Sequence, residues 1–108
     1  MANTTPSDSV SRAVTKEELR EQFLEMARTY AEYWATVPNK TPQERCDGLA
    51  FSMLNIFDGT TASLPAFDIV ARPHPADKQY CISNGENCIE DGTTINDDCM
   101  LHDMYYQR

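Results

Sequence analysis

The chain has 108 residues, with 9 Lys and Arg against 17 Asp and Glu, which gives a formal net charge of -8 at pH 7. This length predicts one domain with a single core, too small for a large internal active site. The acidic balance argues against direct nucleic-acid binding, because phosphate recognition draws on clustered Lys and Arg. No apolar run is long enough for a membrane helix, and the first residues lack the apolar stretch of a secretory signal. We therefore expect a cytoplasmic protein whose four cysteines are thiols.

The N-terminal part combines an irregular head with a well-signalled helix. Residues 1–14 are rich in Ser and Thr and show no apolar period, which predicts a disordered head, leaving 15–108 as a single domain. Thr15 and Glu18 form a capping box, in which each side chain satisfies a free backbone amide. Apolar residues then recur with a period of 3.6 residues, so we predict a helix over about 15–36, ending before Pro38.

A second helix follows after a three-residue link. Thr41 and Glu44 repeat the capping box, and Pro42 stands at the first helical position. Gly59 suits the left-handed conformation that ends a helix. Apolar residues surround more than half of this helix, which predicts that it lies buried between its neighbours. The short link requires the two helices to form an antiparallel hairpin.

Beyond residue 59 the pattern predicts a small sheet and a C-terminal helix. Residues 66–72 alternate between apolar and polar side chains and indicate a strand, which needs a pairing partner, while 93–95 suit an edge strand. Residues 75–89 fit either a short helix through Ser83, which we favour, or a hairpin around Asn84-Gly85. A helix over about 97–106, capped by Asn96 or Asp97, closes the chain. The predicted class is α+β: an antiparallel two-helix hairpin packed with a C-terminal helix and a small β-sheet.

One candidate zinc site follows from cysteine and histidine spacing. Cys99 and His102 are three residues apart on the predicted C-terminal helix, which places sulfur and imidazole on one side. With Cys81 and Cys88 they would complete a set of three thiolates and one imidazole. The structural alternative, which we favour, is that Cys46 and Cys99 are small core residues and that Cys81 and Cys88 are incidental thiols, without a bound cofactor.

A second candidate centre involves the other histidine. His74 lies between two prolines with Asp77 three residues further on, and His102 is followed by Asp103. If the two pairs met, they could hold a divalent metal that activates water, or act as general acid and base. A histidine in a turn more commonly bonds to backbone, and no sequence feature shows that the pairs meet.

The remaining candidates suggest a contact surface. Tyr33, Trp34 and Tyr106 are of the aromatic type that interfaces favour, although the spacing of Trp34 also suits core packing. Glu90 and Asp91 belong to a run from Asn84 to Asp103 that holds six acids and no base. An acidic rim around aromatic side chains suits docking on a basic protein surface, or on a second copy in a homodimer.

Several short runs carry a family resemblance over about residues 42–106. They are Arg45-Cys46-Asp47-Gly48-Leu49-Ala50-Phe51-Ser52, Leu64-Pro65-Ala66-Phe67, Pro73-His74-Pro75 with Asp77, Gly85-Glu86-Asn87 and Leu101-His102. The chain resembles a family of small uncharacterised proteins from bacterial, phage and prophage genomes. That resemblance implies a bacterial cytosol and no particular activity, cofactor or site residue.

Two functions are therefore weighed from the sequence. The favoured one is a non-catalytic, acidic protein-interaction or regulatory module, such as a phage-encoded or prophage-encoded modulator of a host factor. The alternative is a small metal-binding protein, either stabilised by zinc or hydrolytic with the help of a metal.

Overall fold

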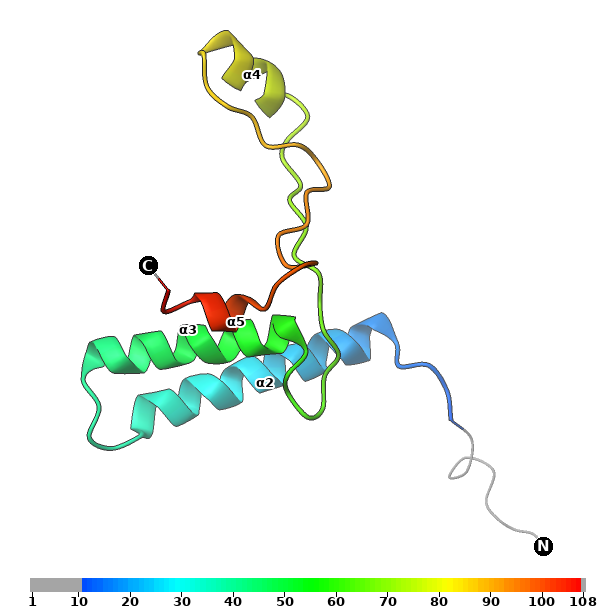
Figure 1. Ribbon diagram of the computed structural model, residues 1–108. Helices are drawn as coiled ribbons and strands as arrows, with labels where there is room; N and C mark the ends of the chain where they lie inside the picture. Colours follow the sequence, from blue (N-terminus) through cyan, green and yellow to red (C-terminus); the bar gives the residue numbers. More distant parts are fainter. Residues whose placement is uncertain (1–10, 108) are drawn as a thin grey trace, which may run out of the picture.

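The computed structural model describes residues 11–107, which form a helical body and a long projecting arm (Figure 1). Helices α2 (Lys16–Thr36) and α3 (Pro42–Asp58) lie side by side in an antiparallel hairpin, and the short helix α5 (Leu101–Met104) packs on α3. We call residues 68–98 the arm; helix α4 (Asp77–Ser83) lies at its tip. The Cα radius of gyration is 19.8 Å, against about 13 Å for a compact chain of this length.

Both predicted capping boxes are confirmed. The Thr15 hydroxyl accepts from the Glu18 amide at 3.1 Å, and the Glu18 carboxylate accepts from the Thr15 amide at 2.9 Å. Thr41 and Glu44 repeat this geometry at 3.1 and 2.8 Å. The Arg12 guanidinium also donates twice to Glu18 at 2.8 Å, and these bonds, with the Thr15 amide, lower the pKa of Glu18 to about 2.

The predicted disordered head falls largely outside what the structure describes. Residues 1–10 lie outside the described range, while 11–14 are exposed and have no regular secondary structure.

The helix ends form as the sequence predicts. Asn39 adopts a φ of 61° in the three-residue link, a left-handed conformation that asparagine tolerates. Gly59 ends α3 with a φ of 77°, and its amide donates to the carbonyls of Asn55 and Ile56. The Arg45 guanidinium donates to the Ala35 carbonyl near the end of α2, so the two helices are also joined at the closed end of the hairpin.

The core is small and is centred on α3. Ile56 and Leu64 are the buried hydrophobic residues of the described chain, at 0% and 6% exposure, and no residue of α2 is buried. Trp34 of α2 packs against Gly48 of α3, and its indole N–H donates to the Ser52 hydroxyl at 2.9 Å. Because α3 contacts both α2 and α5, its predicted central position is confirmed.

The predicted small sheet is wrong, and so is the α+β class. In residues 11–107 the two predicted strands do approach each other, but they form a single antiparallel bridge between Val70 and Thr94. The ladder stops on one side because the Asn96 side chain takes the place of the next backbone pair. Its amide donates to the Phe67 carbonyl at 2.8 Å and its oxygen accepts from the Ile69 amide at 2.9 Å.

On the other side of the bridge, Pro73 has no backbone N–H and cannot donate a hydrogen bond to the opposite segment. What remains of the sheet is therefore two extended segments, 67–71 and 92–96, joined by a few hydrogen bonds at the base of the arm.

Two further sequence predictions are settled by the structure. The helix alternative for residues 75–89 is right, since α4 forms and Gly85 follows it with a φ of 70°, whereas the hairpin alternative is wrong. The predicted C-terminal helix over 97–106 is too long, because only Leu101–Met104 are helical. Asn96 is used in the arm, so neither it nor Asp97 caps this helix.

We predict that Gly48→Ala destabilises the fold although alanine normally favours a helix by about 1 kcal/mol. A Cβ at this position would lie 2.5 Å from three atoms of the Trp34 ring. The ring must move and break its bond to Ser52, so the free energy of unfolding should fall by about 1–3 kcal/mol. Denaturant unfolding followed by fluorescence tests this, because Trp34 is the single tryptophan.

The matched control is Cys46→Ala, an exposed position on the same helix, where we expect a change under about 0.5 kcal/mol. A Gly48→Ala variant that is as stable as the parent and has the same emission maximum would contradict this prediction. It would show that the packing of Trp34 does not require a glycine at position 48.

Candidate functional site

The buried charged side chain of the described residues is the carboxylate of Asp58, the last residue of α3. It is 8% exposed and accepts the backbone amides of Leu101 at 2.9 Å and His102 at 2.7 Å. The Nδ1 atom of His102 lies 2.6 Å from the same carboxylate. Asp58 therefore caps the N-terminus of α5 from more than 40 residues away in sequence, which matters because Met100 offers no capping side chain.

Burial and hydrogen bonding act in opposite directions on this carboxylate. Desolvation by burial raises the pKa of Asp58, because it disfavours the charged form. The hydrogen bonds from the His102 amide and ring and from the Leu101 amide outweigh desolvation, so the pKa of Asp58 lies below its ordinary value. The carboxylate is thus held in its charged form by donors that α5 supplies.

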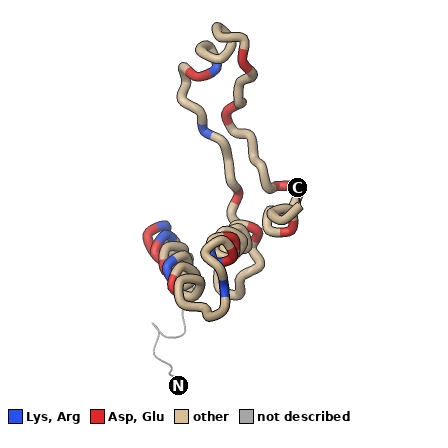
Figure 2. Tube along the Cα trace, turned by 90° about the vertical axis from the view of Figure 1, so that its left-hand side faces the viewer, with Lys and Arg blue, Asp and Glu red and all other residues tan. Residues whose placement is uncertain are grey.

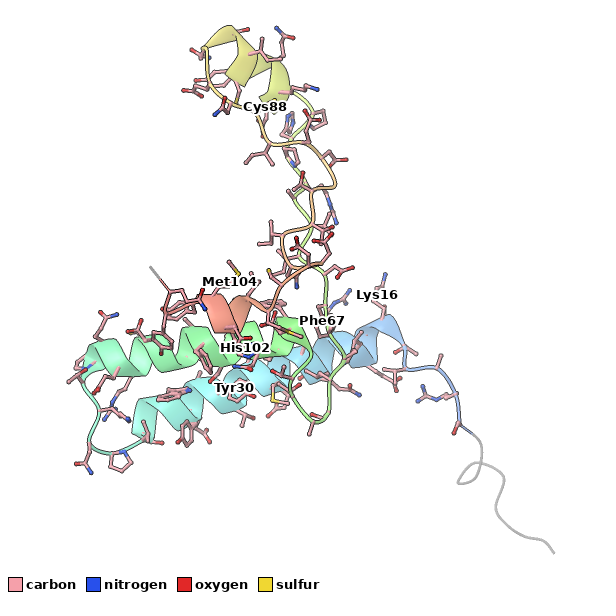
Figure 3. The ribbon with its side chains drawn as sticks, viewed as in Figure 1. Lys16, Tyr30, Phe67, Cys88, His102 and Met104 are labelled. Carbon is pink, nitrogen blue, oxygen red and sulfur yellow. The ribbon has the colours of Figure 1, made fainter. Side chains whose placement is uncertain are left out.

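The imidazole of His102 lies between α3 and the chain end. Its Nδ1 atom must carry the proton in the short contact, because an ionised carboxylate can only accept. Its Nε2 atom lies 3.2 Å from the exposed carboxylate of Asp103. Phe51 of α3 packs edge-on against the ring at a centroid distance of 5.6 Å, and the Tyr106 ring also contacts Phe51, with centroids 5.7 Å apart (Figure 3 shows His102 between α5 and α3).

A buried carboxylate that orients an imidazole is one half of a nucleophilic triad. In such a triad a hydroxyl or thiol stands at Nε2, but here that atom faces Asp103, which is not a nucleophile activated by a base. The geometry of the described residues therefore assigns Asp58 and His102 to holding α5 in place.

Cys99, the thiol nearest in sequence, does not supply the missing nucleophile. Desolvation and the nearby charges of Asp98, Asp58 and Asp97 raise the pKa of its thiol. Its sulfur lies 3.6 Å from the Ile95 carbonyl, as a weak donor. Reactive cysteines need a lowered pKa, so this environment favours an unreactive thiol.

The predicted zinc ligands are spread over the molecule. Cys81 and Cys88 lie on the distal part of the arm, whereas Cys99 is at its base and His102 is on α5 (Figure 3). Within residues 11–107 no group of three or more His, Cys, Asp or Glu side chains is arranged to hold a metal ion.

The second predicted centre is divided in the same way. His74 and Asp77 lie in the arm and organise the turn before α4: Asp77 accepts the His74 amide at 3.0 Å, and His74 Nδ1 accepts the Ala76 amide at 3.1 Å. Both bonds are to backbone, which is the structural alternative weighed from the sequence. Neither residue is joined to the Asp58–His102 contact.

The predicted contact residues also separate into two regions. Tyr33 and Trp34 stack edge-on at 5.1 Å on α2, and Tyr106 packs on the helical body; Tyr33 and Tyr106 are 54% and 57% exposed. Glu90 and Asp91 belong to the arm, so they do not form a rim around those aromatic side chains.

The arm is the most exposed apolar feature of the described chain. Five of its large hydrophobic residues are each more than half exposed: Val70, Tyr80, Ile82, Ile89 and Ile95. The arm also carries seven acidic residues and two basic ones, Arg72 and Lys78. Figure 2 shows acidic positions spread from the base of the arm to its tip, with two basic positions among them.

The sequence offered one unused signal for Asp58. A negative charge at the C-terminal end of a helix is disfavoured by the helix dipole, so an aspartate directly before Gly59 implies a compensating donor elsewhere. No sequence pattern indicated the exposure of the arm, because alternation predicts a strand whether or not the chain supplies a partner.

Comparisons of the chain with protein-family models, curated proteins and solved structures find no match. Among the described helices, none combines the length and apolar character needed to cross a membrane. The resemblance to a bacterial and phage family therefore stays a prediction.

We predict that Asp58→Asn lowers the free energy of unfolding by about 2–4 kcal/mol at neutral pH, because a charged acceptor of three hydrogen bonds is lost. His102→Gln should cost less, since both backbone amides keep their acceptor. Because the pKa of Asp58 is lowered in the folded state, its contribution is complete above the unfolded value of 3.8 and is lost as pH falls through the folded value. Thermal unfolding of parent and variant at several pH values measures this.

The control for that series is Asp97→Asn, an exposed aspartate, with an expected change under about 0.5 kcal/mol. An Asp58→Asn deficit that stays the same from neutral to strongly acidic pH would contradict the role given to the charge.

Proposed function

We propose that this protein is a non-catalytic interaction module of the cytoplasm, and that its arm is the element that contacts another protein. The single observation that carries the proposal is the exposure of the arm's five large hydrophobic side chains. Large apolar side chains gathered on one projecting element favour a surface that a partner covers.

The internal structure of the arm supports this role. The bridge between Val70 and Thr94 and the bonds of Asn96 fix the base, while the distal part is held by α4 and by the exposed ion pair of Lys78 and Glu90 at 3.2 Å. Two paired extended segments are of marginal stability alone. Covering the apolar side chains by a partner would supply the stability that the chain's own core does not.

The free energy gained by burying the arm's apolar side chains is comparable with the cost of association. Complete burial of a fully exposed valine or isoleucine side chain contributes about 1.5–3 kcal/mol. The side chains of the arm are already partly covered, so each gains about half of that. Several such contributions offset the loss of translational and rotational freedom on association, which is about 4–15 kcal/mol. The arm's acidic residues would give the contact specificity for a surface that carries basic groups.

We predict that a photo-crosslinking phenylalanine analogue in place of Tyr80, in α4, forms a covalent adduct with another protein in cells that express the chain. Tyr80 is 67% exposed and lies near the tip of the arm. The same analogue in place of Tyr33, which is 54% exposed on α2, is the matched control and should give little adduct. Denaturing gels and mass spectrometry of the purified adducts measure both.

Adducts from position 80, with a second copy or with a different protein, support the proposal. Adducts from position 33 alone would place the contact on the helical hairpin, and the absence of adducts from both positions would count against an interaction module.

A further inference from the structure

The side of α2 nearest the arm base carries a shallow apolar groove with a basic rim. Leu19 and Phe23 of α2 line it together with Phe57 and Phe67, and Phe23 lies 5.7 Å from the Phe57 ring and 5.8 Å from the Phe67 ring. Lys16 and Arg20 stand along the groove, and Asp68 is the acidic side chain beside it. Figure 3 shows Lys16 at the start of α2, with Phe67 over the same end of the helix.

The two cations of the groove are not neutralised within the described chain. Among the ion pairs of residues 11–107, Arg12 and Arg28 are bonded to glutamates of α2, and Lys78 to Glu90, but neither Lys16 nor Arg20 takes part. They are four residues apart and so lie on one face of the helix. The groove therefore combines an apolar floor with two cations that can accept an acidic partner.

The arm carries the complementary pattern. Ile89 is 66% exposed and is followed directly by Glu90 and Asp91, so an apolar side chain and two adjacent carboxylates occur together. Glu90 also forms the exposed ion pair with Lys78, which it would share with or exchange for a cation of the groove. This matches a groove that offers aromatic rings and two cations one helical turn apart. The arm points away from the groove of its own chain (Figure 1), so the chain that can bring the segment to the groove is another copy.

We infer that two copies of this chain exchange arms, with Ile89 of each copy on the Phe23–Phe57–Phe67 floor of the other and Glu90 and Asp91 beside Arg20 and Lys16. This inference rests on the proposed function, because it names the protein that the arm contacts. The exchange is symmetric, so each dimer contains the contact twice.

The surface available is of the size that a stable dimer needs. If each of the five exposed apolar side chains of an arm buries about 80 Å², one arm loses about 400 Å². Two arms and the surfaces they cover then bury about 1,600 Å², the usual area of a specific interface. Two chains of net charge -8 repel each other at long range, so local pairing of opposite charges at the groove is required for association.

The test uses two full-length variants with opposite defects. In the first, Lys16→Glu and Arg20→Glu make the groove acidic; in the second, Glu90→Lys and Asp91→Lys make the arm segment basic. Each variant alone should dimerise at least about tenfold more weakly than the parent, since like charges meet. An equimolar mixture should restore the dimer, because both contacts of the mixed dimer pair opposite charges.

Matched controls separate this pairing from a general effect of charge. Arg28→Glu with Lys40→Glu changes the charge of the helical body by the same amount away from the groove. Asp97→Lys with Asp98→Lys changes the arm's other acidic doublet, at its base. Both should leave the dimer within about threefold of the parent. Sedimentation equilibrium measures the mass, expected at twice 12.2 kDa for the parent, and circular dichroism checks the helix content.

A monomeric parent, a dimer that tolerates both reversals, or a mixture no better than its components would overturn the exchange. An adduct between position 80 and a different protein, together with a monomeric parent, would leave the proposed interaction module standing and remove the second copy as its partner.

Discussion

The carboxylate of Asp58 determines where the last third of the chain can lie. It stands at the end of α3 that the helix dipole makes unfavourable for an anion, and it is buried, so it needs donors from outside its own helix. The amides of Leu101 and His102 supply these donors, and the carboxylate that accepts from them is the cap that the sequence of α5 lacks. The chain between residues 58 and 101 must therefore leave the helical body and return to the same point, which is the condition for a projecting arm.

The base of the arm is closed by a second polar side chain. The Asn96 side chain bonds to two backbone groups of the opposite segment, the Phe67 carbonyl and the Ile69 amide. It therefore holds the two segments together shortly before the chain reaches α5. Asp58 holds the chain that follows them, and the Phe67 amide bonds to the Phe57 carbonyl of α3. Beyond the single bridge at Val70 the segments are held by few bonds, and their apolar side chains remain exposed. The attachment of the arm is therefore held by more hydrogen bonds than its distal part, which agrees with the proposal that a partner covers the distal part.

The sequence predicted the features that depend on neighbouring residues. Thr15, Thr41 and Gly59 act through contacts within a few positions, so the hairpin of α2 and α3 could be predicted with nearly correct limits. The sheet could not, because alternation describes side chains and does not reveal that Asn96 ends the ladder. The Asp58–His102 contact spans 44 residues and has no repeating pattern, so residues predicted as metal ligands are found in separate structural roles.

The division between body and arm also explains the small core. About a third of the chain lies in the arm and adds no buried hydrophobic residue, so the body must fold with the remaining residues. Bodies of this size bury a smaller fraction of their surface and gain little stability from it. A partner that covers the arm would stabilise the whole chain, because a partner that binds only the folded form shifts the folding equilibrium. Under the proposed function, folding and contact with a partner are linked, and the uncovered apolar side chains of the arm are the cost in stability of that role.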